Sequence, residues 1–201
     1  MLIPTGNLWR FAVRAVDGEI GRIHDLQVDD RRWGICDIAV DAGHWLTGHV
    51  LLIRPSVVVK SDRGNQTIHV ALTAEQIADA YVSEGDSPRL LQVDPHVRSL
   101  RALGRYGIEA SDGEAGHVED WLVDVQTWRI RYAVVKTACG RARRHVLVPV
   151  HELGAISWSA RAIYADLPRN AIVHAPEYEP ASQPNAGPVT GSGRWLSRRS
   201  A

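Results

Sequence analysis

The chain has 201 residues, enough for one large domain or two small ones. Hydrophobic residues make up 45% and charged residues 23%, a balance that indicates a globular core and excludes a largely disordered chain. The 23 basic residues equal the 23 acidic residues, so no overall field directs the protein to nucleic acid or to an acidic membrane.

The N-terminal segment shows no export signal. Arg10 and Arg14 interrupt its apolar stretch, whereas a signal peptide has an unbroken apolar region. No segment approaches the roughly 20 apolar residues that span a bilayer. Two cysteines, Cys36 and Cys139, cannot build a disulfide framework. We therefore expect a cytoplasmic protein.

An internal repeat divides the chain. The string DGEIGRIHD of residues 17–25 returns as DGEAGHVED at residues 112–120, 95 residues later. Pro55 then aligns with Pro149, which indicates one residue fewer in the second copy. The same offset joins three identical pairs: Trp33 with Trp128, Ile35 with Ile130 and Val40 with Val135. The pattern predicts two homologous units, residues 1–82 and 99–180, joined by a linker at residues 83–98.

In chain order, the first unit shows β signals. Asp17 and Gly18 are typical of a tight hairpin turn with a positive φ at the glycine. The apolar spacing after this turn predicts a bulge near Gly21. Thr73 and Gln76 form a capping box that predicts a helix running to about Tyr81. The expected strands cover Ile20–Val28, Trp33–Val40, Val50–Val59 and Thr67–Leu72.

The second unit repeats the series. Asp112, Gly113 and Gly116 take the turn and bulge positions. Pro168 suits the first turn of a short helix, and the prolines after it forbid a long one. Residues 181–201 are mostly Pro, Ser, Gly, Ala, Asn and Thr, which predicts a disordered tail. The expected strands cover Leu103–Ala110, Ala115–Val123, Trp128–Val135, His145–Val150 and Arg161–Ala165.

Both units resemble the PRC-barrel family. The resemblance rests on the repeated Asp-Gly-Glu-x-Gly-x-x-x-Asp motif, the tryptophan in the strand that follows it and the ending at Leu72–Ile77. It implies a mainly β fold of two tandem small PRC-type β-barrels, each closed by a short helix. The cytoplasmic part of the photosynthetic reaction centre H subunit and the C-terminal domain of a ribosome maturation factor share this fold. The family supplies binding and assembly modules and implies no shared catalytic residues.

The loops after the third strand differ most between the units. The first loop carries Trp45 and Leu46, whereas the second carries Arg141, Arg143 and Arg144. We expect Trp45 to serve mainly structure and the arginines to reach solvent. These five residues are the candidate partner-binding positions.

Catalysis would require the turn carboxylates as an acid and base pair, for instance Glu19 with Asp25 or Glu114 with Asp120. We expect instead that Asp25 and Asp120 accept backbone or arginine hydrogen bonds at a strand kink, so the protein is not an enzyme. The histidines form no four-ligand zinc spacing, and no glycine-rich phosphate loop is present. We therefore expect no metal and no cofactor.

The sequence thus predicts a non-catalytic protein-interaction, scaffold or assembly module with an unidentified protein partner. Self-association and peripheral membrane contact stay open, whereas membrane insertion and nucleic-acid binding are not expected. Three alternatives stay open: a ribosome-associated or RNA-associated maturation factor, an assembly component of a photosynthetic or electron-transfer complex, and an enzyme that uses the turn carboxylates.

Overall fold

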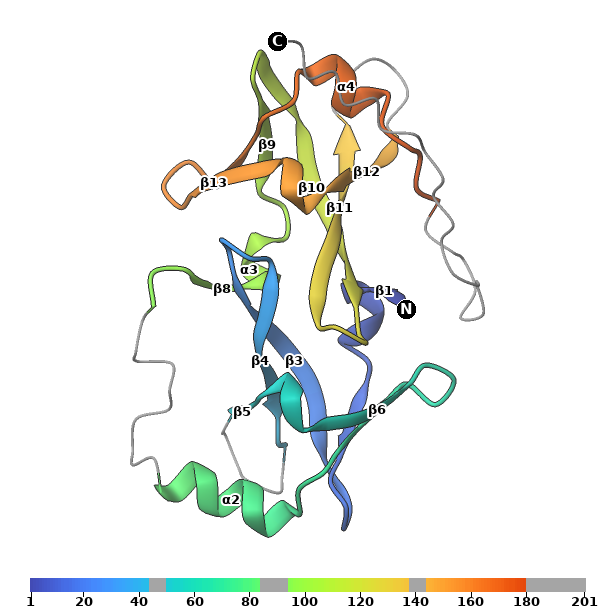
Figure 1. The fold of residues 1–201 in the computed structure, drawn as a ribbon, viewed down its shortest axis with the longest axis vertical. Coiled ribbons are helices and arrows are strands. Elements are labelled where there is room, and N and C mark those ends of the chain that lie inside the picture. The colour runs from blue at the N-terminus through green and yellow to red at the C-terminus, as the bar shows by residue number, and fades with distance from the viewer. Residues whose placement is uncertain (44–49, 84–93, 138–143, 180–201) are drawn as a thin grey trace.

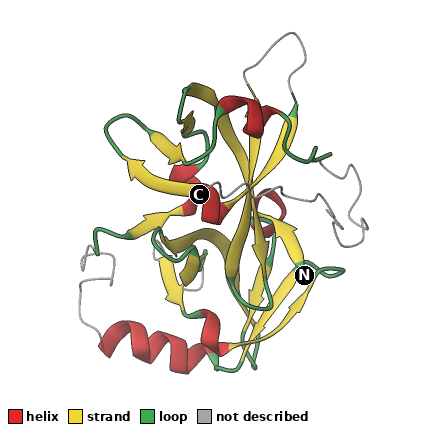
Figure 2. Ribbon diagram, turned by 45° about the horizontal axis from the view of Figure 1, so that its top comes forward, coloured by secondary structure: helices red, strands yellow, loops and turns green. Residues whose placement is uncertain are grey.

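The computed structural model describes residues 1–43, 50–83, 94–137 and 144–179. Strands dominate this part of the chain, and the helices are short (Figure 2). Among the described residues, no helix combines the length and the apolar character needed to cross a membrane. The expected mainly β fold is therefore confirmed.

The chain consists of two halves with the same order of elements (Figure 1). The first half contains β1 (Leu2–Pro4), α1 (Thr5–Leu8), β2 (Ala12–Arg14), β3 (Glu19–Asp29), β4 (Gly34–Asp41), β5 (Val50–Ile53), the 3-10 helix η1 (Pro55–Val57), β6 (Val58–Asp62), β7 (Thr67–Val70) and α2 (Ala74–Ser83). The second half contains β8 (Val97–Ser99), α3 (Leu100–Leu103), β9 (Gly107–Ala110), β10 (Gly113–Asp124), β11 (Arg129–Thr137), β12 (His145–Pro149), the 3-10 helix η3 (Val150–Glu152), β13 (Leu153–Ser157), β14 (Ala162–Ala165) and α4 (Arg169–Val173). Each element begins 95 residues after its counterpart, to within one residue.

The constant offset corrects the expected missing residue. Pro55 begins η1 and its structural counterpart is Val150, whereas Pro149 corresponds to Arg54. The two prolines are therefore not structural counterparts, and the second copy has no residue fewer than the first over this stretch. The expected strand over Val50–Val59 is also wrong in one respect, because η1 divides it into β5 and β6.

Two other boundaries differ from expectation. The second half begins inside the expected linker, because β8 starts at Val97. The strand expected from Leu103 starts only at Gly107, after the α3 turn. The rest of the linker, residues 84–93, and the tail expected to be disordered, residues 181–201, lie outside the described residues.

In the described part of the chain, all strands join one hydrogen-bonded network that does not close on itself. The longest pairs, β3 with β4 and β10 with β11, are antiparallel and lie in different halves. Between the halves, β4 meets β11 through the single register pair Gly34 and Arg129. Two closed barrels are therefore not confirmed, although each half contains the same strand pairings.

The halves also exchange their N-terminal segments, residues 2–8 and 97–103. Strand β1 pairs with β10 of the second half, where Ile3 lies opposite Val123. Strand β8 pairs with β3 of the first half, where Arg98 lies opposite Val28. The two registers are related by the same 95-residue offset, so the exchange is reciprocal (Figure 1). Each half thus supplies a strand that completes the other.

A single apolar core runs through both halves. Trp33 and Trp121 stack in it with ring centroids 5.2 Å apart. Trp33 and Trp128 have φ values of 52° and 49°, so each sits in a turn just before the strand in which it was expected. Their carbonyls accept reciprocal hydrogen bonds from Ile130 N at 2.9 Å and Ile35 N at 2.8 Å. The repeated tryptophans therefore mark the junction of the halves.

Candidate functional site

The first repeated carboxylates, Asp17 and Asp112, cap helices. Asp17 Oδ1 accepts a hydrogen bond from Ala74 N at 2.9 Å, at the start of α2. Asp112 Oδ1 accepts one from Arg169 N at 2.6 Å, at the start of α4. The first N–H groups of a helix have no partner within it, so an external carboxylate is a strong substitute. These aspartates tie each tight turn to the helix that ends its own half.

The capping box expected in the first half is confirmed. Thr73 Oγ1 accepts a hydrogen bond from Gln76 N at 3.2 Å, and Gln76 Oε1 accepts one from Thr73 N at 2.9 Å. In the second half the residue before the helix is Pro168, whose side chain forms no cap. Asp112 is thus the side chain that caps α4 from outside.

The second repeated carboxylates hold the exchanged segments. Asp25 Oδ1 accepts hydrogen bonds from Leu26 N at 2.7 Å and Arg101 N at 3.0 Å. Asp25 Oδ2 accepts a further hydrogen bond from the Ser99 hydroxyl. Asp25 is only 8% exposed and lies at a register shift between β3 and β4. The expectation that it accepts backbone hydrogen bonds at a strand kink is confirmed.

Asp120 does the same for the other exchanged segment. Its Oδ1 accepts hydrogen bonds from Trp121 N at 2.8 Å, Gly6 N at 3.2 Å and the Thr5 hydroxyl. Burial raises the pKa of Asp120 above its ordinary value, although the hydrogen bonds from Thr5, Trp121 and Gly6 oppose this shift. Asp25 and Asp120 therefore each bind the exchanged N-terminal segment of the other half.

Two of the repeated glycines permit a close crossing of strands. At Gly21 (φ 150°) a Cβ atom would lie 2.1 Å from the carbonyl oxygen of Asp41, and at Gly116 (φ 144°) it would lie 2.2 Å from that of Lys136. Any side chain there would force β3 or β10 away from its neighbour. The bulge expected near Gly21 is confirmed by the register shift in the β2 and β3 pairing.

The two turn glycines behave differently from each other. Gly113 has a φ of 125°, as expected. Gly18 has no positive φ, so that expectation is wrong, and a Cβ atom there would meet nothing within 4 Å. The first turn therefore does not require glycine for its backbone conformation.

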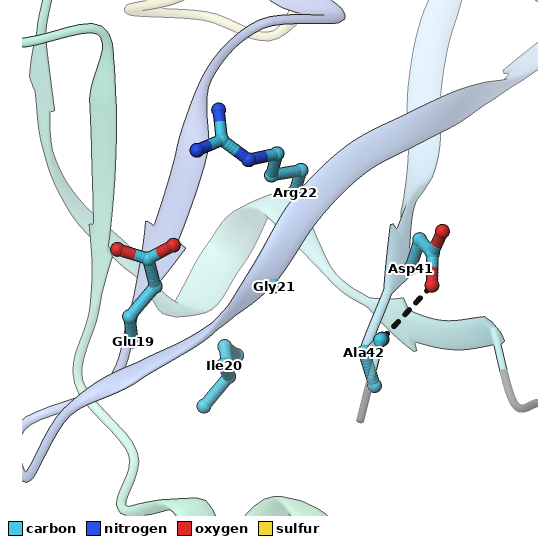
Figure 3. Close-up of a pocket in the computed structure, with 7 residues that line it drawn as sticks. Glu19, Ile20, Gly21, Arg22, Asp41 and Ala42 are labelled. Atoms are coloured by element: carbon cyan, nitrogen blue, oxygen red, sulfur yellow. Dashed lines mark hydrogen bonds between the residues drawn. The ribbon is translucent and has the colours of Figure 1, made fainter. Parts of the chain in front are cut away.

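A pocket of about 390 Å³ lies beside Gly21 (Figure 3). Its lining comes from Glu19 to Arg22 on β3 and from Asp41 to Gly43 at the end of β4. Asp41 Oδ1 accepts a hydrogen bond from Gly43 N at 2.9 Å. In Figure 3 the side chains of Glu19, Arg22 and Asp41 extend in different directions rather than toward one point.

Most of the expected partner-binding loops lie outside the described residues, namely Trp45, Leu46, Arg141 and Arg143. Arg144 is described and its side chain is exposed. Its backbone carbonyl accepts a hydrogen bond from Thr137 N at 2.9 Å, which closes the base of this loop. The structure thus places Arg144 immediately before β12, with its side chain exposed to solvent.

Sequence reasoning missed an aromatic cluster around Trp158. Trp158 is 46% exposed in the turn between β13 and β14. Tyr106 packs edge-on against its ring at a centroid distance of 6.0 Å. The Arg98 guanidinium lies 4.7 Å from the ring centroid and also forms an ion pair with Asp30 at 2.7 Å. Comparison of the copies could have found it, because its counterpart is Arg63.

The structure also bears on the metal and thiol hypotheses. Within the described ranges, no group of three or more potential metal ligands comes together. Burial, together with nearby Asp29 and Asp37, raises the pKa of the Cys36 thiol, which keeps it protonated and weakly nucleophilic. Cys139 lies outside the described residues.

No known protein-family model matches the chain, and no curated protein is significantly similar to it.

Proposed function

We propose that the chain is a cytoplasmic, non-catalytic interaction or assembly module built from two PRC-type barrels. The observation that carries this proposal is the use of the repeated carboxylates. Asp17 and Asp112 bind helix N-termini, and Asp25 and Asp120 bind the exchanged segments. The part of the sequence that both copies share therefore maintains the fold, and function belongs to the surfaces that differ.

The Trp158 cluster is the best binding surface among the described residues. A tryptophan that is half exposed and already held in place loses little conformational entropy when a partner covers it. Tyr106 and Arg98 hold the ring from two sides, and Asp30 holds Arg98. This cluster therefore offers a partner an aromatic face with one cation beside it.

Affinity recovery from source-cell lysate, with chemical crosslinking and mass spectrometry, tests the proposal. Trp158→Ala should reduce recovery of the specific partner at least fivefold without changing the melting temperature. Val59→Ala is the matched control, because Val59 is 67% exposed on β6 of the other half. Equal recovery with Trp158→Ala would refute this surface. Recovery of RNA that is lost at high salt would favour the RNA-associated alternative instead.

A further inference from the structure

The outer edge of β12 is closed by the chain's own C-terminal segment. Leu147 N donates a hydrogen bond to the Pro176 carbonyl at 2.9 Å, and Tyr178 N donates one to the His145 carbonyl at 2.7 Å. Val146 and Glu177 form the antiparallel bridge between them. Three residues, 176–178, thus act as a short extra strand.

The side chain of Tyr178 then covers the outer face of the sheet. It is 7% exposed and belongs to a small apolar cluster distinct from the main core. Its partners are Leu122 of β10, Val134 of β11 and Leu147 of β12. Leu147 is consequently buried, at 4% exposure.

Strand β5 presents the same edge in the first half. Ala39 lies opposite Leu52, as Val134 lies opposite Leu147, so the two strands share one register. Leu52 N and the Val50 carbonyl therefore point away from β4, like their counterparts in β12. Among the described residues, neither group has a hydrogen-bond partner on that side, and Leu52 is only partly buried.

The difference between the edges comes from the lengths of the two helices. Helix α4 ends at Val173, and Pro176 prevents its extension, so the chain turns back onto β12. Helix α2 runs on to Ser83, through the residues that correspond to 176–178. Residues 81–83 of the first half therefore belong to the longer helix α2, whereas their counterparts 176–178 pair with β12 (Figure 1).

We propose that the edge of β5 binds an extended segment of a partner protein, which adds to the sheet as an antiparallel strand. An exposed strand edge offers unpaired N–H and C=O groups, and a peptide strand satisfies them. The bound segment 176–178 shows the geometry that the site accepts. This inference rests on the proposed interaction function and identifies where and how a partner segment would bind.

Charge at the site selects the side chains of that segment. In β11, Lys136 lies opposite His145, the residue that Tyr178 pairs with. Its counterpart in the first half is Asp41, which is exposed and lies opposite Val50. A basic side chain opposite Val50 is therefore favoured.

The neighbouring row has a different character. Ala39 and Leu52 form a small apolar floor there, which suits an aliphatic residue two places earlier in the segment. The expected partner segment therefore has an aliphatic residue opposite Leu52, then any residue, and then a basic residue opposite Val50 and near Asp41.

The probe is a labelled peptide, acetyl-Ser-Thr-Val-Thr-Arg-Thr-Ser-amide, tested by fluorescence polarisation against the full chain. It should bind at least tenfold more tightly than the same peptide with Glu in place of Arg. Methylation of the Arg amide nitrogen should abolish binding, because that N–H takes the place of Tyr178 N. Methylation of the preceding Thr amide, which points away from β5, is the matched control and should have little effect. These changes leave the protein unaltered, so misfolding cannot produce the result.

Two measurements on the protein complete the test. Asp41→Asn should reduce the preference for arginine to less than threefold, whereas Glu114→Gln on β10 should leave it unchanged. Hydrogen exchange should show the Leu52 amide unprotected in the free chain and protected at least tenfold by the peptide, with Leu147 protected in both states.

Three outcomes would overturn the inference. They are absence of peptide binding, equal effects of the two methylations, and a Leu52 amide that is already protected in the free chain. The last would mean that the chain itself covers the edge or, if protection rises with protein concentration, that a second copy does. None of these outcomes affects the recovery that depends on Trp158, so the proposed function and this inference fail separately.

Discussion

Replacement of Asp25 with alanine tests the exchange of N-terminal segments. The change removes the acceptor for three donors: Leu26 N, Arg101 N and the Ser99 hydroxyl. A buried donor left without a partner costs about 1–3 kcal/mol, and two of the three donors are backbone N–H groups. The serine hydroxyl can rotate toward water. We therefore expect Asp25→Ala to lower the free energy of unfolding by about 2–6 kcal/mol, a large part of the ~5–15 kcal/mol of a typical domain.

Urea unfolding of the full chain, followed by tryptophan fluorescence, measures this loss. Asp25→Asn is the control, because both backbone N–H groups bind Oδ1, and an asparagine keeps that oxygen. It should cost less than about 1.5 kcal/mol, near the net value of one hydrogen bond. Asp120→Ala should match Asp25→Ala in size, because its carboxylate binds the other segment in the same way.

A double-mutant cycle shows whether the loss comes from the exchanged segment. Asp25→Ala and Ser99→Ala should be coupled, since their side chains bond directly, whereas Asp25→Ala and Thr5→Ala should be additive. The reasoning would be refuted by a loss below 1 kcal/mol for Asp25→Ala. It would also be refuted by equal losses for the alanine and asparagine variants.

Three further predictions concern the shared framework. Gly113→Val should lower stability by at least about 1 kcal/mol in thermal unfolding, whereas Gly18→Val should change it little, since only Gly113 has a positive φ. Burial raises the pKa of Asp120 above 3.8, so the folded state holds this proton more tightly than the unfolded state. The resulting stabilisation is complete below pH 3.8 and is lost as the pH rises through the folded-state pKa of Asp120. Over that range the wild type should therefore lose stability relative to Asp120→Asn in urea unfolding. A gain in stability relative to Asp120→Asn would contradict the prediction. A metal chelator should leave the unfolding curve unchanged, and a shift would contradict the metal-free hypothesis.

The repeat was predictable because short local sequence motifs define it. Asp, Gly and Glu at fixed spacing identify the turn. Thr73 and Gln76, which are three residues apart, form a capping box that identifies the start of a helix. The bulge at Gly21 was also predictable, since the apolar spacing changes there. Each of these features depends on residues that are close together in the sequence.

The exchange was not predictable in this way. Strands β1 and β8 have three residues each, too few for a periodic pattern. Which half each strand joins depends on pairing across more than 70 residues, as between Ser99 and Gln27. The alignment of Pro55 with Pro149 misled for a related reason: identical residues suggested equivalence, whereas the structural counterpart of Pro149 is Arg54.

The site was predictable only where the copies could be compared. The contrast between the two loops is visible in the sequence, and so is the contrast between Arg63 and its counterpart Trp158. The open edge of β5 could not be found from residue types, because Leu52 and Leu147 are identical counterparts. What separates them is whether the chain after the last helix returns to the sheet.

Reciprocal exchange explains how the two halves can differ so much at their surfaces. Separation of the halves would break both segment pairings and expose Trp33 and Trp121. It would also remove from Asp25 and Asp120 the donors of the exchanged segments, Arg101 N and Gly6 N. Those terms act together, so the stability of the whole depends on residues that both copies retain. Positions outside that shared set can differ between the halves without loss of this stability. An example is Asp41 in the first half, whose counterpart in the second half is Lys136. The first half could keep an open β5 edge with an acidic neighbour while the second half closed its own.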